Sequence, residues 1–137
     1  MADKAYVIIA NMKVDKVFDN KYKSTLPKTM KSAAEGAIKN SANMTTQKPS
    51  NKDAKAYSLD STVTSLAQNG KSLEVKLSMA LSEDDHMFGF LNGGGKLQNG
   101  NPKQLYGDVE DLISGVIVSL IKDKVSKAIQ EKLSKGP

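Results

Sequence analysis

The chain has 137 residues, of which 39% are hydrophobic and 26% charged, enough apolar material for one packed core and too much for global disorder. It has no cysteine, no tryptophan and one histidine, which excludes disulfides, thiol nucleophiles and multi-histidine metal sites. All 20 basic residues are lysine, and the formal net charge is +5. Arginine usually makes the bidentate contacts to phosphate and guanine, so its absence argues against phosphoryl transfer and base reading.

No segment reaches the roughly 18 apolar residues that a membrane-spanning helix needs. The longest apolar stretch, Leu112 to Ile121, is interrupted by Ser114, Gly115 and Ser119. The N-terminus has a short apolar run without a cleavage site, so no secretory signal is predicted. We expect a cytoplasmic protein as the chain is written, and a periplasmic or envelope protein if it is a mature fragment that lacks its signal.

Residues 5–14 are predicted to form the first strand. Its even-numbered residues share one face and Val7 and Ile9 the other, and both faces are apolar at the start. This pattern is typical of a central strand covered on both sides. Pro27 is then predicted to open a helix, because its missing N–H costs nothing at the first position. The apolar stripe of this helix is narrow and consists mostly of alanine. A polar loop is predicted to follow over residues 45–55.

A β-hairpin is the clearest signal in the chain. Apolar residues alternate with polar ones over residues 57–67 and again over residues 72–82, and Asn69-Gly70 lies between the two runs. A two-residue turn at Asn69-Gly70 would place apolar side chains opposite polar ones. The pattern therefore favours a three-residue loop that pairs Ala67 with Lys71 and Val63 with Val75, with Gly70 in the left-handed region.

The third strand of this meander is predicted over His86–Leu91, and the glycines that follow either end it or continue it as a bulged segment. A C-terminal helix begins after the capping residue Asn101 and Pro102. Its apolar stripe spans about 50 Å at 1.5 Å per residue. The helix therefore either breaks near Gly107 or Gly115 or projects beyond the sheet.

The predicted fold is a single α+β domain over residues 1–137, with the element order β-α-β-β-β-α. An antiparallel sheet of about four strands is covered by two helices, of which the C-terminal one is long. The methionine and phenylalanine side chains are predicted to belong to the core, notably Met12, Met30, Met44, Met79, Met87, Phe88 and Phe90.

The C-terminal helix is the candidate interface. It is apolar on nearly all sides between Leu112 and Ile121, which a small sheet cannot cover alone. A second copy or a protein partner would cover the remainder; the alternative is burial by the first helix alone. The candidate interface residues are Leu112, Val116, Ile117, Leu120, Ile121 and Val125.

A lysine-rich stretch over residues 13–39 is the candidate anion-binding region. Phe18 and Tyr22 could stack on bases there; the alternative is a solvated basic surface. The candidate residues are Lys13, Lys16, Lys21, Lys23, Lys28 and Lys31.

Two further motifs are weaker. The cluster Asp84-Asp85-His86 could hold a divalent ion or a general base, but it is interpreted as a solvated turn, because adjacent turn residues rarely converge on one point. Asn92-Gly93-Gly94-Gly95-Lys96 could cradle an anion with backbone N–H groups, but it is interpreted as a flexible or bulged strand end. We predict no catalytic, metal-binding or cofactor-binding residues and no cofactor.

The stretch Tyr57–Gly94, with YSLDSTVTSL, SLEVKLSMALSEDD and HMFGFLNGG, resembles the sheet region of small bacterial cell-envelope lipoprotein domains of the curli-secretion and penicillin-binding-protein-activator type. Those domains have Y-x-x-x-G-x-V, then an alternating V-x-V-x-L strand and a strand beginning with an aromatic or glycine motif. Ser61 stands where the usual glycine would be, and there is no lipidation cysteine. The resemblance implies a non-enzymatic assembly or docking role in the envelope and transfers no site residues.

The function predicted from these features is that of a non-enzymatic module for protein–protein interaction or assembly, associated with the envelope or part of a larger oligomer. We expect a homo-oligomer or a protein partner. The alternative is a lysine-mediated binder of polyanions, either nucleic acid or an anionic surface.

Overall fold

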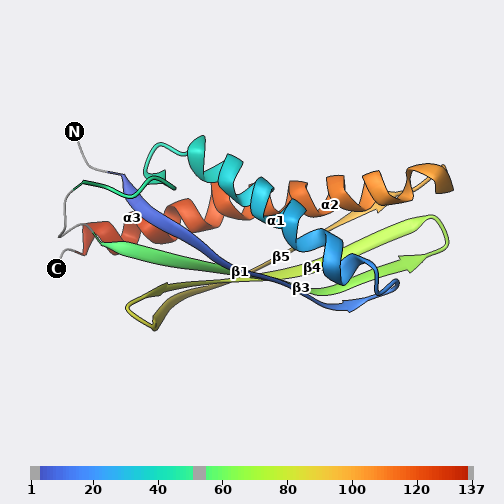
Figure 1. Ribbon diagram of the computed structural model, residues 1–137, viewed down its shortest axis with the longest axis horizontal. Helices are drawn as coiled ribbons and strands as arrows, with labels where there is room; N and C mark the ends of the chain where they lie inside the picture. Colours follow the sequence, from blue (N-terminus) through green and yellow to red (C-terminus); the bar gives the residue numbers. More distant parts are fainter. Residues whose placement is uncertain (1–3, 51–54, 136–137) are drawn as a thin grey trace.

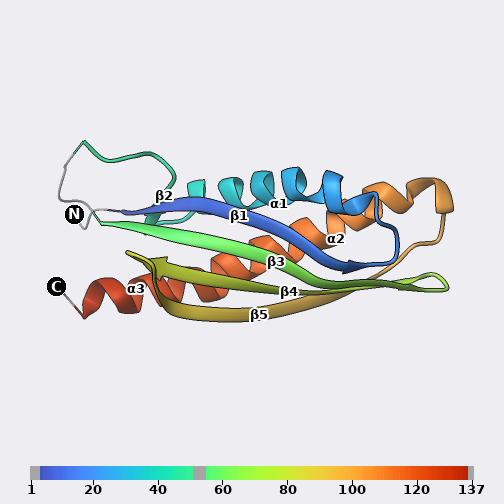
Figure 2. The same cartoon turned by 60° about the horizontal axis from the view of Figure 1, so that its bottom comes forward.

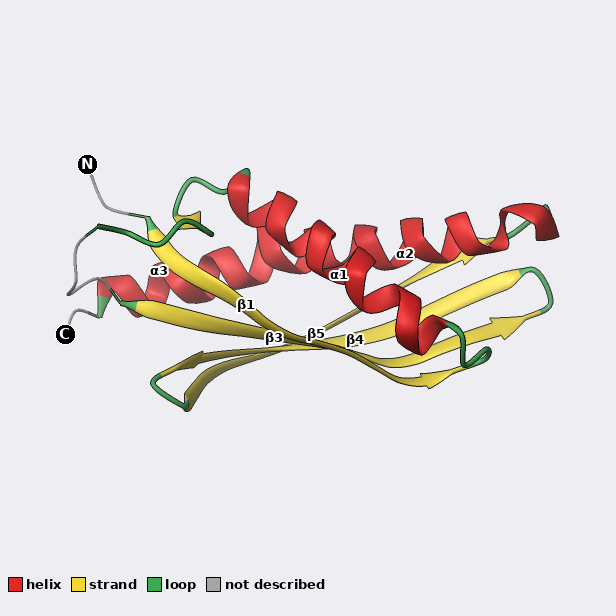
Figure 3. Cartoon of the chain, in the orientation of Figure 1, coloured by secondary structure: helices red, strands yellow, loops and turns green. Residues whose placement is uncertain are grey.

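The computed structural model describes residues 4–50 and 55–135 and has two layers. A five-stranded sheet in the order β2-β1-β3-β4-β5 carries its helices on one face only (Figures 1 and 3). The strands are β1 (Ala5–Val17), β2 (Met44–Thr45), β3 (Ala56–Asn69), β4 (Ser72–Glu83) and β5 (His86–Gln98). The helices are α1 (Tyr22–Lys39), α2 (Leu105–Leu120) and α3 (Ser126–Ser134); a 3₁₀ turn, η1 (Pro102–Gln104), precedes α2, and a π-helical segment, η2 (Ile121–Val125), joins α2 to α3.

The expected α+β class with two covering helices is confirmed, but the sheet is mixed rather than antiparallel. β1 runs parallel to both β2 and β3, whereas β3, β4 and β5 form an antiparallel meander. The parallel pair follows from α1, because a helical crossover returns the chain to the end of the sheet where β1 began.

The face assignment of β1 is corrected by a bulge. Ile9 pairs with Leu59 and Met12 with Ser61, so β1 has one extra residue between these pairs. The extra residue reverses the alternation, and Ala5, Val7, Ile9 and Met12 all face the helices. Ile8 lies on the other face and is 40% exposed, because no helix covers that face. The prediction of a strand buried on both sides is therefore wrong.

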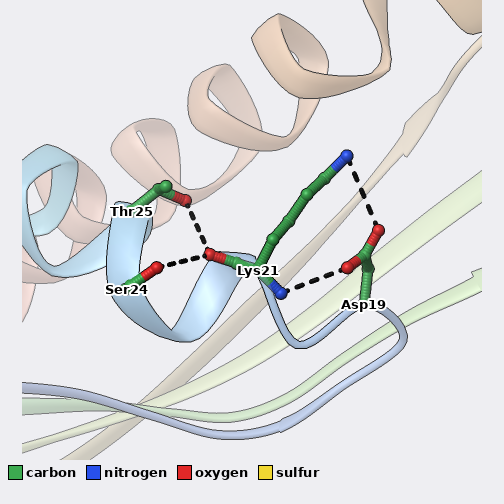
Figure 4. Close-up of polar contacts among 4 residues, drawn as sticks. All are labelled: Asp19, Lys21, Ser24 and Thr25. Atoms are coloured by element: carbon green, nitrogen blue, oxygen red, sulfur yellow. Dashed lines mark hydrogen bonds and ion pairs between the residues drawn. The ribbon is translucent and has the colours of Figure 1, made fainter.

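Helix α1 begins at Tyr22, five residues before the predicted start at Pro27. Figure 4 shows the reason: the Asp19 carboxylate accepts a hydrogen bond from the Lys21 backbone N–H (3.1 Å) and lies 3.6 Å from the Lys21 ammonium. The carbonyl of Lys21 accepts hydrogen bonds from the hydroxyls of Ser24 and Thr25. These contacts start the helix a turn early, and Pro27 lies within it. The buried residues of α1 recur every four positions: Tyr22, Leu26, Met30, Ala34 and Ile38.

The β3–β4 hairpin has the expected left-handed glycine but a different loop. Gly70 has φ +61°. The loop consists of Gly70 and Lys71 alone, because Asn69 already pairs with Ser72. A glycine with positive φ at the first of two loop positions matches the twist of the strands. The predicted pairing of Ala67 with Lys71 is therefore wrong.

A bulge at Thr64 explains why the apolar pattern predicts the wrong register for this hairpin. The Thr64 hydroxyl donates a hydrogen bond to the carbonyl of Lys76 (3.1 Å), and β3 gains one residue relative to β4 there. Val75 consequently pairs with Leu66 rather than with Val63. Before the bulge the buried residues of β3 are odd-numbered, and after it the buried residue is the even-numbered Leu66. A simple alternation of period two does not predict this change.

Strand β5 continues through the glycine run to Gln98, so the predicted continuation of the strand is confirmed, although its pairing with β4 through the three glycines is regular rather than bulged. It begins after a two-residue turn in which Asp84 and Asp85 both have positive φ. A register shift near the start of the strand separates the two phenylalanines: Phe88 packs against the core, whereas Phe90 is 60% exposed. Met87 is also 60% exposed, so the prediction that Met87 and Phe90 belong to the core is wrong.

The C-terminal helical region is continuous from residue 102 to residue 134, with no break at Gly107 or Gly115. Asn101 caps its start by accepting a hydrogen bond from the Lys103 backbone N–H, as expected. After the 3₁₀ turn at its start, this region departs from α-helical geometry at η2, where the Ser126 N–H donates to the Ile121 carbonyl five residues earlier. This wider turn keeps the apolar residues on the buried face through Val125 and Ile129.

Candidate protein-contact site

The six predicted interface residues are buried within the chain itself. Ile117, Ile121 and Val125 are fully covered, and Leu112, Val116 and Leu120 are between 4% and 8% exposed. The apolar stripe is too long for the width of a small sheet, but the helix runs diagonally along the strands (Figure 2). The 14 residues of β3 span about 46 Å at 3.3 Å per residue, close to the length of the helix. The premise that a second copy must cover these residues is therefore corrected.

The six lysines of the candidate anion-binding region are exposed but lie on different elements: Lys13 and Lys16 on β1, Lys21 just before α1, and Lys23, Lys28 and Lys31 on α1. Tyr22 is fully buried and stacks on Tyr106 with ring centroids 5.8 Å apart, so it cannot stack on a base as expected. Polyanion binding by these lysines stays a prediction, and a steep loss of affinity with salt would support it.

The acidic cluster lies where the sequence placed it, in the exposed β4–β5 turn. Among residues 4–50 and 55–135, no three histidine, aspartate or glutamate side chains are grouped so as to hold a metal ion. The glycine run lies inside β5 and is followed by the rest of that strand, not by a helix N-terminus. The interpretation of the run as an anion cradle loses its geometric basis, because such cradles use loop N–H groups.

The glycine run instead shapes the contact between β5 and α2. A Cβ atom on Gly93 would lie 2.9 Å from the Leu120 side chain, and one on Gly95 would lie 3.0 Å from Val116. Gly94 faces the other way, and its Cβ would lie 2.8 Å from the carbonyl oxygen of Val75 on β4. Side chains at these three positions would push α2 away from the strand or break the β4–β5 ladder. The glycines therefore permit the close approach of the helix.

A groove of about 360 Å³ remains between the outer side of β5 and α2. Glycines form both walls, Gly93 and Gly94 on the strand and Gly115 on the helix, and leucine and valine side chains form the floor. We call this feature the edge groove; its residues are Gly93, Gly94, Leu112, Gly115, Val116, Ser119, Leu120, Asp123 and Lys124. The slight exposure of Leu112, Val116 and Leu120 is explained by the missing side chains of the strand wall.

The edge groove runs beside an open sheet edge. β5 is the last strand on its side of the sheet, so half of its backbone N–H and C=O groups point away from β4. It has 13 residues, no proline and one charged side chain, Lys96, which lies 3.7 Å from Glu74. The Lys124 ammonium donates a hydrogen bond to the Asn92 carbonyl (3.0 Å) from the far wall of the groove. The site thus combines apolar side chains with unpaired backbone groups, the two features that an added strand requires.

Polar contacts outside the groove join the C-terminal helical region to neighbouring segments. The Asn99 backbone N–H donates to the Lys71 carbonyl (2.6 Å), and its side chain donates to the Asp108 carboxylate (2.8 Å). At the other end, the Asn43 side chain donates to the carbonyl of Ser126, next to the π-helical segment. These contacts join the start of α2 to the residue that follows β5, and the start of α3 to the segment that precedes β2.

Two tyrosines have perturbed acidity, and neither lies in the edge groove. Burial raises the pKa of Tyr22, assisted by the negative charge of Asp19 and by Tyr106. Burial likewise raises the pKa of Tyr57, with a further contribution from the Glu83 carboxylate. Both groups are protonated at neutral pH, so they act as packed aromatic side chains.

No protein-family model matches the chain, and a comparison with curated proteins finds no match either. The fold, however, is similar to that of known structures. Protein XCC0632 from Xanthomonas campestris, of family DUF330, superposes with a TM-score of 0.67 at 10% identity, covering 96% of this chain and 89% of that one. At this identity the similarity shows the fold alone.

A PelC dodecamer from Paraburkholderia phytofirmans superposes with a TM-score of 0.55 at 11% identity, covering 88% of this chain and 92% of that one. A minor lipoprotein from Acinetobacter baumannii reaches 0.49 at 12% identity, over 85% and 93% of the two chains. The first two superpositions show that the chain shares its fold with bacterial proteins, one of which crystallised as a dodecamer. A specific relation to curli-secretion or penicillin-binding-protein-activator domains stays a prediction.

Within the described residues, no helix has the length and apolar character needed to cross a bilayer.

Proposed function

We propose that this chain is a non-enzymatic protein-contact module that assembles with further copies of itself. The observation that carries the proposal is the open edge of β5 together with the apolar edge groove beside it. Long strands with unpaired edges are normally shielded by charges, prolines, bulges or a covering element. An edge that lacks most of these devices and faces an apolar groove is suited to contact with another polypeptide.

The similarity to PelC supports the self-assembly part of the proposal, because that protein forms a dodecamer on the same fold. The non-enzymatic part is supported by the chemistry of the groove. Its lining is aliphatic or glycine apart from Ser119, Asp123 and Lys124. In the described part of the chain these three side chains make no hydrogen bond or ion pair with one another, so no base is set against a nucleophile, and the Lys124 ammonium donates to the Asn92 carbonyl.

An association with the bacterial envelope is proposed on a separate ground, the resemblance of residues 57–94 to envelope lipoprotein domains. Fractionation of cells that express the natural gene tests it. Recovery with the envelope fraction supports the proposal, and recovery with the cytosolic fraction contradicts it.

Multi-angle light scattering over a hundredfold range of concentration tests self-assembly directly. The monomer has a mass of 14.7 kDa, and we expect the weight-average mass to rise above this value with concentration. A mass that stays at the monomer value over the whole range would contradict self-assembly.

A further inference from the structure

We infer that two copies of this chain pair through their β5 strands, antiparallel and about a two-fold axis near Asn92, so that the sheet continues from one copy into the other. The inference rests on the proposed function and names the surface and the geometry of the contact. A second copy satisfies both features of the site. Its β5 pairs with the unpaired backbone groups, and its α2 covers the edge groove from the opposite side.

The helix wall of the groove has small residues that allow a second helix to approach closely. Gly115 and Ser119 lie one turn apart on α2, and both are exposed. A Cβ atom on Gly115 would meet nothing within 4 Å, so this position opens onto free space. Two antiparallel copies of α2 can therefore approach each other over the seam, with small residues between them and the leucine and valine floor beneath.

The charges along β5 favour pairing with itself. The strand begins after Asp84 and Asp85, which are exposed and make no ion pair with any residue that the structure describes. It ends beside Lys71, which is exposed and makes no ion pair with a described residue, and near Lys96, whose ammonium lies 3.7 Å from the Glu74 carboxylate. An antiparallel partner places the acidic start of one strand beside the basic end of the other, at both ends of the contact.

Opposite charges would also meet at the middle of the β5 edge. Asn92 is the midpoint of β5, and Asp123 and Lys124 lie beside it on the groove wall. A two-fold axis there brings Lys124 of each copy toward Asp123 of the other. The bond from Lys124 to the Asn92 carbonyl is exposed, so its loss on pairing is a small penalty.

The opposite edge of the sheet is a poorer partner for β5. A head-to-tail arrangement would place β5 parallel to β1 of the next copy, because β5 and β1 run in the same direction within the sheet. Lys96 would then approach Lys13 and Lys16 at the ends of the two strands. The β1 bulge between Ile9 and Met12 lies in the middle of that strand and would interrupt the ladder of hydrogen bonds there, whereas the register shift of β5 lies near its start.

A pair of glycine variants tests whether the groove is the interface. Gly115→Arg places a long charged side chain at the mouth of the groove, whereas Gly107→Arg makes the same change on the same helix, outside the groove, where a Cβ also meets nothing. Both remove a helical glycine, so neither is expected to unfold the chain. We expect Gly115→Arg to raise the dissociation constant at least tenfold and Gly107→Arg to change it less than twofold, measured by sedimentation equilibrium.

Cysteine crosslinking tests the two-fold geometry, and the absence of native cysteine makes each label unique. Two residues that face each other across an antiparallel pair are about 4.5–5.5 Å apart at Cα, within disulfide range. We expect Asn92→Cys to form a covalent dimer under mild oxidation, and Lys13→Cys, exposed on the opposite edge, to form none beyond background.

The outcomes separate this inference from the proposed function. A wild-type chain that stays monomeric overturns both. An oligomer that survives unchanged in Gly115→Arg, that is lost equally in Gly107→Arg, or that crosslinks no better through Asn92→Cys than through Lys13→Cys overturns the β5 pairing and leaves self-assembly standing.

Discussion

The two outer long strands of the sheet, β1 and β5, have the same length, but their free edges differ in how they are protected. β1 and β5 each have 13 residues. β1 carries three charged side chains, has a bulge in its middle and is covered at its start by β2. β5 has one charged side chain, a register shift only near its start and a run of three glycines, and the apolar edge groove lies beside it.

The edge of β1 is therefore protected against pairing with another strand, and the edge of β5 is not. Charges, bulges and covering strands are the devices by which natural sheets prevent unwanted pairing. They are concentrated at β1, although both strands are long enough to recruit another chain. The glycines of β5 act in the opposite direction, because they leave the floor of the groove open.

The first prediction has the greatest effect and concerns the buried core beneath α2. Ile117 and Ile121 are fully buried, so replacing both with lysine places two unpaired charges in the core. Each is expected to destabilise by several kcal/mol, which together exceeds the stability of many small domains. Circular dichroism should show an unfolded chain. Val118→Lys is the control, because Val118 is 40% exposed on the same helix and its variant should stay folded.

A folded Ile117→Lys/Ile121→Lys monomer would instead restore the sequence-based hypothesis that these residues form an interface between copies.

A second prediction concerns the glycine run of β5. Gly94→Ala forces a Cβ against the backbone oxygen of Val75, which cannot move without breaking the β4–β5 ladder. We expect a loss of about 1–3 kcal/mol in the free energy of unfolding, measured by urea titration. Gly36→Ala on α1, where a Cβ meets nothing, should be stabilising by up to about 1 kcal/mol. Equal effects at the two positions would contradict the role assigned to the run.

A substitution at the β1 edge should lower the free energy of unfolding by less. Asn11 lies at the β1 bulge, where its backbone and side-chain N–H groups both donate to the Asp60 carboxylate at 2.9 and 3.0 Å. Asn11→Ala removes only the exposed side-chain bond, and we expect a loss of about 0.5–1.5 kcal/mol with no change in association. A weakened oligomer would show that β1, rather than β5, takes part in the contact.

The smallest effect is expected at alkaline pH, on the β1 side of the molecule. The pKa of Tyr22 is raised above its ordinary value of 10.0 by burial, by Asp19 and by Tyr106. Above pH 10 the unfolded chain therefore releases this proton while the folded chain retains it, and the stability falls as the pH rises. Tyr22→Phe should flatten this decline in urea titrations between pH 9 and roughly 11. An unchanged slope would contradict it.

Much of the fold could be predicted because local chemistry determines it. Asn101 and Pro102 mark the start of the C-terminal helix, and Gly70 has the left-handed conformation that its place in the hairpin requires. The bulge in β1 and the one at Thr64 could not be predicted, because a single extra residue reverses every following side chain without a signal in composition. The parallel β1–β3 pair could have been predicted from the helix between the two strands.

The candidate site could be predicted only in part. The sequence singled out both the glycine run and the apolar helix, but as separate features. Their relation depends on the length of β5, which brings Gly93 and Gly95 beneath Leu120 and Val116. The available signal was three consecutive glycines inside an otherwise regular strand, which indicates close approach of another backbone or helix.

Hydrogen exchange at low and high protein concentration distinguishes the two edges of the sheet. We predict that amides of β5, around Asn92, become protected as the concentration rises, whereas amides of β1 between Val7 and Val17 keep the same exchange rates. Protection that rises at β1 and not at β5, or at neither strand while light scattering shows association, would contradict it.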